Sequence, residues 1–174
     1  MTSNFPIVTT EEEFKSSNPG YCNDVWTELI IQAPPAVVRA TVLDFKNRSS
    51  FDPFYRHIEV VKGQLDDLDT KPAISLTFDF DMDGKKEMTV PFHPTISRND
   101  EECLVWGFRV LCGWFYMVDH VHVFVPIDDG KATRLVNYER ICGFMKYFTP
   151  TKTFFAPFHA SNAALKKVCE ERAK

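Results

Sequence analysis

Hydrophobic and polar residues alternate along much of the chain after residue 57, which predicts a series of half-buried β-strands. The clearest case is the segment 74–82, where Ile74, Leu76 and Phe78 share one face and Ser75 belongs to the other. Turn sequences such as Asp-Gly separate these segments and are typical of hairpins. Strands are expected at residues 25–31, 57–62, 74–82, 87–97, 104–110, 116–127 and 133–144.

Spacings of three and four between apolar residues predict helices at two places. A short helix is expected at 36–45, after Pro34 and Pro35 end the first strand, and a second short helix or turn at 47–56. A long helix is expected from Pro150 to the end of the chain. Its inward stripe comprises Phe154, Phe158, Asn162 and Leu165.

This order of elements predicts an α+β fold in which an antiparallel sheet of about seven strands curves around the C-terminal helix. The sheet must bury one face, and the terminal helix is the only long element that can cover it. We expect such a bent sheet to enclose a cavity. Residues 23–174 are expected to form a single domain after a polar lead-in at residues 1–22.

Composition excludes several classes of function. The net charge is −4, and the scattered Lys and Arg residues form no basic patch for nucleic acid. No apolar stretch approaches the roughly 20 residues of a membrane-spanning helix, and the N-terminus lacks the features of a secretion signal. The five cysteines have no C-x-x-C spacing, which argues against a disulfide framework or zinc site and favours a cytoplasmic location.

Aromatic residues are abundant, with 16 Phe, 3 Trp and 5 Tyr. Such residues fill ordinary cores and also line pockets for lipophilic ligands, and composition does not separate the two.

Three groups of residues follow one another in a set order. The first comprises Ile31-x-Ala33-Pro34-Pro35-x-Val37-Val38, Leu43-Asp44-Phe45 and Phe51-Asp52-Pro53-Phe54. The second comprises Leu104-x-Trp106, Asp119-His120-x-His122-x-Phe124, Thr133-Arg134-Leu135 and Glu139-Arg140-x-x-Gly143. The third comprises Phe158-x-x-x-Asn162-x-x-Leu165. Together they resemble the START-like superfamily of helix-grip proteins, the SRPBCC group that includes polyketide cyclases and pollen-allergen-like plant proteins.

The resemblance implies a helix-grip fold and leaves the activity open, because family members divide into enzymes that cyclise, dehydrate or isomerise and carriers that only bind. Two positions depart from the family's pattern. His122 stands where the family's hairpin more often has an aromatic residue, and Asp119 replaces the usual Glu.

The predicted hairpins bring polar residues together on the inner face. If Ile127 lies opposite Ala132, then His122 faces Asn137 and His120 faces Glu139. If the preceding hairpin places Trp106 opposite His120, then Leu104 lies opposite His122. Opposed side chains have Cβ atoms about 4.5–5.5 Å apart, close enough for an imidazole and a carboxylate to hydrogen-bond.

A buried imidazole and carboxylate must be paired, shifted in pKa or contacted by ligand. Our hypothesis is that His120, steered by Glu139, transfers a proton on a bound substrate while His122 and Asn137 hold an oxygen. A network that only binds or orients a ligand, a purely structural pairing, and a metal site formed by the two histidines and the carboxylate remain open. No metal and no cofactor are expected.

Further residues are expected to contact the ligand: Trp106, Phe78, Phe108, Phe124, Tyr55, Phe158 and Asn162. Tyr55 is a candidate for the pocket entrance. His57 and His93 are expected on the outer face or in a bend, and His159 beside the inward stripe of the helix.

The favoured function is a cofactor-independent cyclase, dehydratase or isomerase of secondary metabolism that acts on a polyketide-like or aromatic small molecule. The alternative is a non-catalytic carrier or sensor of a hydrophobic ligand. The ligand, the reaction and the oligomeric state are not predicted.

Overall fold

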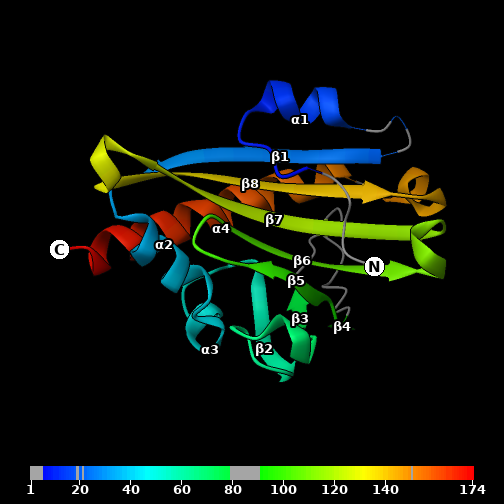
Figure 1. The fold of residues 1–174 in the computed structure, drawn as a ribbon, viewed down its shortest axis with the longest axis horizontal. Coiled ribbons are helices and arrows are strands. Elements are labelled where there is room, and N and C mark those ends of the chain that lie inside the picture. The colour runs from blue at the N-terminus through cyan, green and yellow to red at the C-terminus, as the bar shows by residue number, and fades with distance from the viewer. Residues whose placement is uncertain (1–5, 19, 21, 79–90, 150) are drawn as a thin grey trace.

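An antiparallel sheet of eight strands forms the body of the protein (Figure 1). The computed structural model describes residues 6–18, 20, 22–78, 91–149 and 151–174. The strands lie in the order β1-β8-β7-β6-β5-β3-β2, and β4 pairs with β3. Their bounds are β1 Cys22–Ile31, β2 Tyr55–Lys62, β3 Ala73–Phe78, β4 Pro91–Phe92, β5 Thr95–Asn99, β6 Cys103–Val110, β7 Tyr116–Ile127 and β8 Ala132–Cys142.

The described part of the predicted strand at 87–97, which begins at Pro91, forms two short strands, β4 and β5, and this accounts for eight strands where about seven were expected. Residues 87–90 lie outside the described residues. Pro94 lies between β4 and β5, and proline has no N–H to donate to a sheet ladder. The predicted Asp83-Gly84 turn and residues 79–82 of the neighbouring strand lie outside the described residues.

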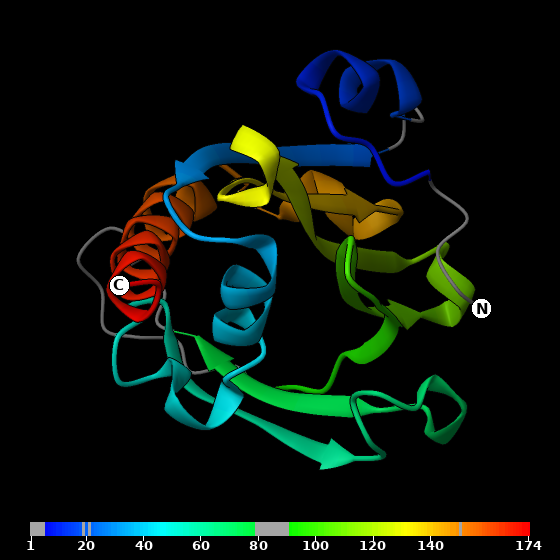
Figure 2. The same ribbon diagram turned by 60° about the vertical axis from the view of Figure 1, so that its left-hand side comes forward.

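Within the described ranges, four α-helices accompany the sheet: α1 Glu11–Ser17, α2 Pro35–Val42, α3 Phe45–Arg48 and α4 Thr151–Arg172. Short 3₁₀ turns lie at η1 Leu68–Thr70, η2 Leu111–Gly113, η3 Asp128–Gly130 and η4 Phe144–Phe148. Figure 2 shows the sheet curving from β1 round to β2, with α2 and α4 on its inner side. The predicted long helix and the two short helices after the first strand are therefore confirmed. In the described part of the chain, no helix is both long and apolar enough to cross a membrane.

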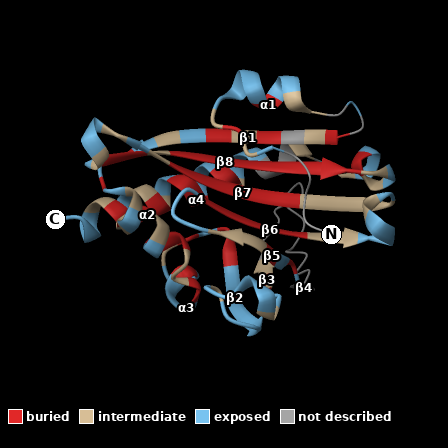
Figure 3. Cartoon of the chain, viewed as in Figure 1, coloured by how far each residue is buried: buried red, intermediate tan, exposed pale blue. Residues whose placement is uncertain are grey.

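The main apolar core lies between the sheet and the helices α2 and α4. Val38 and Val42 of α2 pack with Phe158 and Leu165 of α4 in one cluster of buried side chains. Figure 3 shows that buried residues follow the middle of the sheet along β6, β7 and β8. The predicted inward stripe of the terminal helix is confirmed from Phe158 to Leu165, whereas the side chain of Phe154 lies outside the described part.

The helix α1 covers part of the convex face and was not predicted. Phe14, its only buried residue, packs between Trp26 and Tyr138, with ring centroids 5.0 and 4.8 Å away. The Arg140 guanidinium lies 5.0 Å from the centre of the Phe14 ring. The lead-in therefore includes a helix that buries a second apolar cluster on the outside of the sheet.

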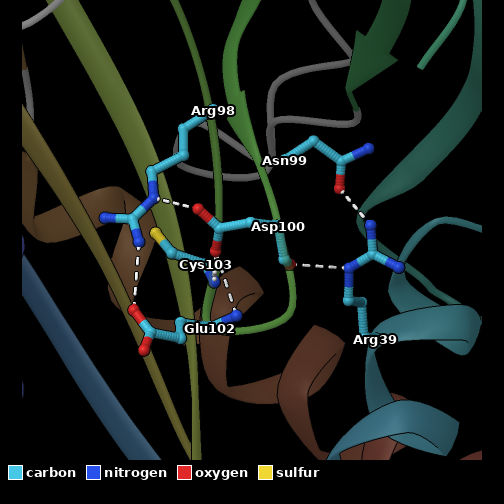
Figure 4. Close-up of polar contacts among 6 residues, drawn as sticks. All are labelled: Arg39, Arg98, Asn99, Asp100, Glu102 and Cys103. Atoms are coloured by element: carbon cyan, nitrogen blue, oxygen red, sulfur yellow. Dashed lines mark hydrogen bonds and ion pairs between the residues drawn. The ribbon is translucent and has the colours of Figure 1, made fainter. Parts of the chain in front are cut away.

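The turn between β5 and β6 is tied to α2 by the Arg39 side chain (Figure 4). Its Nε donates to the backbone carbonyl of Asp100 and its Nη2 to Asn99 Oδ1, each at 2.7 Å. The carboxylate of Asp100 accepts the N–H of Cys103 at 2.9 Å and pairs with Arg98. These contacts tie α2 to the turn that leads from β5 into β6.

Cys22 and Cys142 form a disulfide between directly opposed residues of β1 and β8. The argument against disulfides was wrong for this pair, because the partners are 120 residues apart in the sequence and only the fold brings them together. Cys103 and Cys169 are buried free thiols, and Cys112 is exposed. The cytoplasmic location stays a prediction.

A buried ion pair joins the region after α3 to the long helix. Arg48 Nε lies 2.7 Å from Asp52 Oδ2, and the side chains are only 3% and 0% exposed. Ser161 of α4 donates its hydroxyl to the same carboxylate oxygen at 2.6 Å. Because the Asp52 carboxylate binds both Arg48 and Ser161, it fixes α4 relative to the segment that leads into β2.

Replacing Asp52 with Ala should therefore destabilise the fold, because it leaves the Arg48 charge buried without its partner. We expect the free energy of unfolding to fall by about 3–5 kcal/mol in chemical denaturation. The matched control is Glu11→Ala, which breaks the exposed Lys15–Glu11 pair at the same spacing of four residues and should change stability very little. Equal effects of the two substitutions would contradict this assignment.

Candidate functional site

The strand register brings the predicted polar residues together. His120 lies opposite Glu139 and His122 opposite Asn137 between β7 and β8. Trp106 lies opposite His120 on the other side, between β6 and β7. All five side chains are buried, and His120 and Asn137 contact Phe158 and Asn162 of α4, so the predicted pairing and its inward direction are both confirmed.

His120 and Glu139 form a buried hydrogen bond. The distance between His120 Nδ1 and Glu139 Oε1 is 3.0 Å, and the residues are 4% and 9% exposed. An ionised carboxylate can only accept, so with Glu139 ionised the imidazole donates through Nδ1–H. In this pairing a neutral ring has its lone pair on Nε2, the arrangement that a neighbouring carboxylate imposes on a general base.

Aromatic rings fix the orientation of His120. Trp106 stacks on the imidazole with ring centroids 4.7 Å apart and an angle of 9° between the planes. The Phe158 ring of α4 contacts it at 5.3 Å and the His122 ring at 4.7 Å. His120 is thus held between the sheet and the long helix, with an indole face available to stabilise a protonated ring.

Several buried polar atoms at this place have no hydrogen-bond partner among the described residues. They are His120 Nε2, both ring nitrogens of His122, and Asn137 Oδ1. Buried polar atoms are normally paired, and an unpaired one costs about 1–3 kcal/mol. Four such atoms, on three adjacent side chains, therefore mark a place where a ligand with polar atoms would be stabilised.

Asn137 is itself positioned by a chain of hydrogen bonds to α4. Its Nδ2 donates to Asn162 Oδ1 at 3.1 Å, and Asn162 Nδ2 donates to Thr27 Oγ1 at 2.9 Å. The Thr27 hydroxyl donates to the Asn137 carbonyl at 2.9 Å. The predicted residue Asn162 thus holds Asn137 in place. Thr27 is the third member of this hydrogen-bonded group and was not predicted from the sequence.

Burial and charge keep His122 neutral. Removal from water holds its pKa well below the usual 6.5, and the neighbouring His120 and Arg48 lower it further. Its ring therefore has one N–H to donate and one lone pair to accept with.

The remaining predicted pocket residues lie in different surroundings. Phe124 is buried in the main core, and Phe108 is half-buried with its ring 5.4 Å from that of Tyr116. Tyr55 is 4% exposed and packs in the main core, and its role at a pocket entrance stays a prediction. Its ring lies 5.2 Å from the Arg48 guanidinium, and burial raises the pKa of its hydroxyl. The side chain of Phe78 lies outside the described part.

Sequence reasoning missed a second buried polar group, separate from the His120 and Asn137 groups. It consists of Arg48, Asp52 and Ser161. The only sequence signal was the four-residue spacing of Arg48 and Asp52, which also suits an ordinary exposed helix pair. Tyr116 was missed as well, and its pKa is raised by burial and by the Glu139 carboxylate.

The other histidines do not join the site. His57, His93 and His159 are exposed, and His57 Nε2 lies 3.2 Å from Glu59 Oε1. Within the described ranges, no three His, Cys, Asp or Glu side chains are placed to hold a metal ion, so His120, His122 and Glu139 do not form a metal triad.

The low pKa of His122 makes stability depend on pH. Below about pH 6.5 the unfolded chain binds a proton at this ring while the native chain does not. The free energy of unfolding therefore decreases by up to about 1.4 kcal/mol for each unit by which the pH is lowered. Above that pH the ring is neutral in both states and contributes no slope. We expect the stability difference between wild type and His122→Gln to shift against wild type as the pH falls toward about 5. Denaturation curves that keep this difference constant would contradict the buried, neutral ring.

Comparison of the sequence with family models and with curated proteins gives no match. Solved structures do match over most of the chain. An aromatase/cyclase from a Streptomyces species has a TM-score of 0.62 at 11% identity, covering 88% of this chain and 96% of its own. A major latex-like protein from Panax ginseng has a TM-score of 0.65 at 6% identity, covering 85% and 97%.

A START superfamily protein from Mycobacterium smegmatis has a TM-score of 0.57 at 14% identity, covering 86% of this chain and 96% of its own. At identities this low, a structural match shows a shared fold and does not show a shared activity. The chain has the START-like helix-grip fold that its sequence patterns predict.

Proposed function

We propose that the chain binds a lipophilic small molecule with carbonyl or hydroxyl oxygens between the sheet and α4, and transfers a proton on it without a cofactor. The observation that carries this proposal is the buried His120 ring, whose Nδ1 lies 3.0 Å from Glu139 Oε1 and whose Nε2 has no partner among the described residues. This is the arrangement of a general base with its orienting carboxylate.

The surroundings favour an aromatic or polyketide-like ligand. The rings of Trp106 and Phe158 contact His120, and Phe54 packs against Phe158 at 5.7 Å. Such surfaces suit flat, apolar molecules, while His122 and Asn137 supply the few polar contacts that fix an oxygen. The fold shared with an aromatase/cyclase is compatible with this substrate class.

The proton transfer follows from the His120 tautomer. Nε2 accepts a proton from a carbon next to a carbonyl group, and the C–H electron pair forms an enolate. The Glu139 carboxylate and the Trp106 face stabilise the imidazolium, while the neutral His122 donates its N–H to the enolate oxygen. The imidazolium then returns the proton, either to carbon in an isomerisation or to a hydroxyl group that leaves as water. No oxidant or reductant is needed.

A 1,3-diketone tests this reaction without knowledge of the natural substrate. We expect the wild-type chain to accelerate deuterium exchange at the central carbon of benzoylacetone in D₂O, followed by NMR. His120→Asn should lower the rate by about 10²–10⁴-fold, and Glu139→Gln, which keeps the shape but removes the charge, by about tenfold or more. Binding of benzoylacetone, measured by calorimetry, should persist in both variants.

The exposed His57 provides the matched control, because His57→Asn removes an imidazole that is remote from the site. Its exchange rate should equal that of wild type. Exchange in His120→Asn as fast as in wild type would contradict the proton transfer. A wild-type chain that binds the diketone without accelerating exchange would identify the alternative, a non-catalytic carrier.

A further inference from the structure

Two turns at one end of the sheet expose large apolar side chains. The turn η2 and the residues after it lead from β6 into β7, and η4 follows β8. Their exposed residues, called here the aromatic tip, are Leu111, Trp114, Phe144, Tyr147 and Phe148, each between 51% and 74% exposed. Isolated exposed apolar residues are ordinary, whereas five on two adjacent turns indicate an interaction surface.

The backbone holds these side chains outward. Phe144 N–H donates to the Trp114 carbonyl at 3.1 Å, and Met145 N–H to the Phe115 carbonyl at 2.9 Å, so the two turns form one unit. Gly143 has a φ of +90°, and a Cβ there would lie 2.7 Å from the Trp114 oxygen. The disulfided Cys142 directly precedes it. These contacts therefore fix the backbone conformation of the tip.

The five residues of the aromatic tip are uncharged, and the two segments that carry them contain one charged residue. Residues 110–118 and 141–151 contain no Asp or Glu, in a chain that has 24 of them. The one cation of these segments, Lys146, is turned inward: its Nζ donates to the Gly20 carbonyl at 3.1 Å, and its own carbonyl accepts from Asn23 Nδ2 at 2.8 Å. An uncharged tip on an acidic protein fits an electrically neutral surface.

A groove of about 560 Å³ runs between the two turns, with Trp114, Met117, Phe144 and Tyr147 among its lining residues. Lys146 also lines it, and its Nζ lies 4.8 Å from the centre of the Tyr147 ring. The groove is mostly apolar and open to solvent, so it would accept a flexible apolar chain from outside. The flanking Trp and Tyr rings combine an apolar body with a polar group, the chemistry that enriches them at the boundary between lipid headgroups and acyl chains.

We propose that the aromatic tip docks the protein on the surface of a zwitterionic lipid bilayer, with the side chains of the two turns inserted among the headgroups and the groove occupied by an acyl chain. Docking is driven by burial of apolar surface and not by charge, since Lys146, the cation of segments 110–118 and 141–151, is turned inward. This inference does not depend on proton transfer by His120.

Flotation with phosphatidylcholine vesicles tests the proposal. We expect wild type to float with the vesicles, nearly independent of salt, and the double variant Trp114→Ala, Phe148→Ala to lose at least about tenfold in partition coefficient. The matched control is Ile30→Ala, Val61→Ala, which removes apolar side chains that are 49% and 50% exposed on β1 and β2 and should bind as wild type does. Circular dichroism checks that all variants remain folded.

Trp114 gives a second readout, because its indole is 72% exposed while Trp106 is buried. Its fluorescence should shift to shorter wavelength on vesicles and be quenched by brominated lipid, and Trp114→Phe should abolish the shift. Absence of flotation, unchanged binding by the double variant, or binding that requires phosphatidylserine and disappears in salt would overturn the proposal. So would a wild-type dimer in sedimentation that becomes monomeric in the double variant, because a second copy would then cover the tip.

Discussion

The antiparallel register between β7 and β8 is the constraint on which the site depends. Side chains alternate between faces with a period of two, so a slip of one residue would turn His120, His122 and Glu139 to the opposite face. The turn η3 sets this register by placing Ile127 opposite Ala132. Asp128, Asp129 and Gly130 all have positive φ, a conformation that short polar residues and glycine tolerate best.

The long helix supplies the other side of the site. Phe158 contacts the His120 ring, Asn162 holds Asn137, and Ser161 bonds to the Arg48–Asp52 pair. These three residues lie within five positions of α4, so one turn of helix connects the proposed base, its polar neighbours and the buried ion pair. A change in the position of α4 would therefore disturb both the proposed site and the stability of the fold.

Local patterns predicted the elements and the pairing, whereas contacts between distant segments escaped them. Alternation and turn residues were enough to place His120 opposite Glu139, because hairpin partners are close in sequence. The disulfide of Cys22 with Cys142 and the bond from Ser161 to Asp52 join residues more than 100 positions apart. The helix α1 was missed because its single buried residue, Phe14, gives no periodic signal.

The central claim is that Glu139 holds the proton of His120 on Nδ1 and leaves Nε2 free to act on a ligand. Nitrogen-15 NMR of protein labelled at histidine measures this directly, with and without benzoylacetone. We expect the proton on Nδ1, a lone pair on Nε2, and a shift of the Nε2 resonance when the diketone is added. A proton on Nε2, or a resonance unchanged at saturating diketone, would contradict the account.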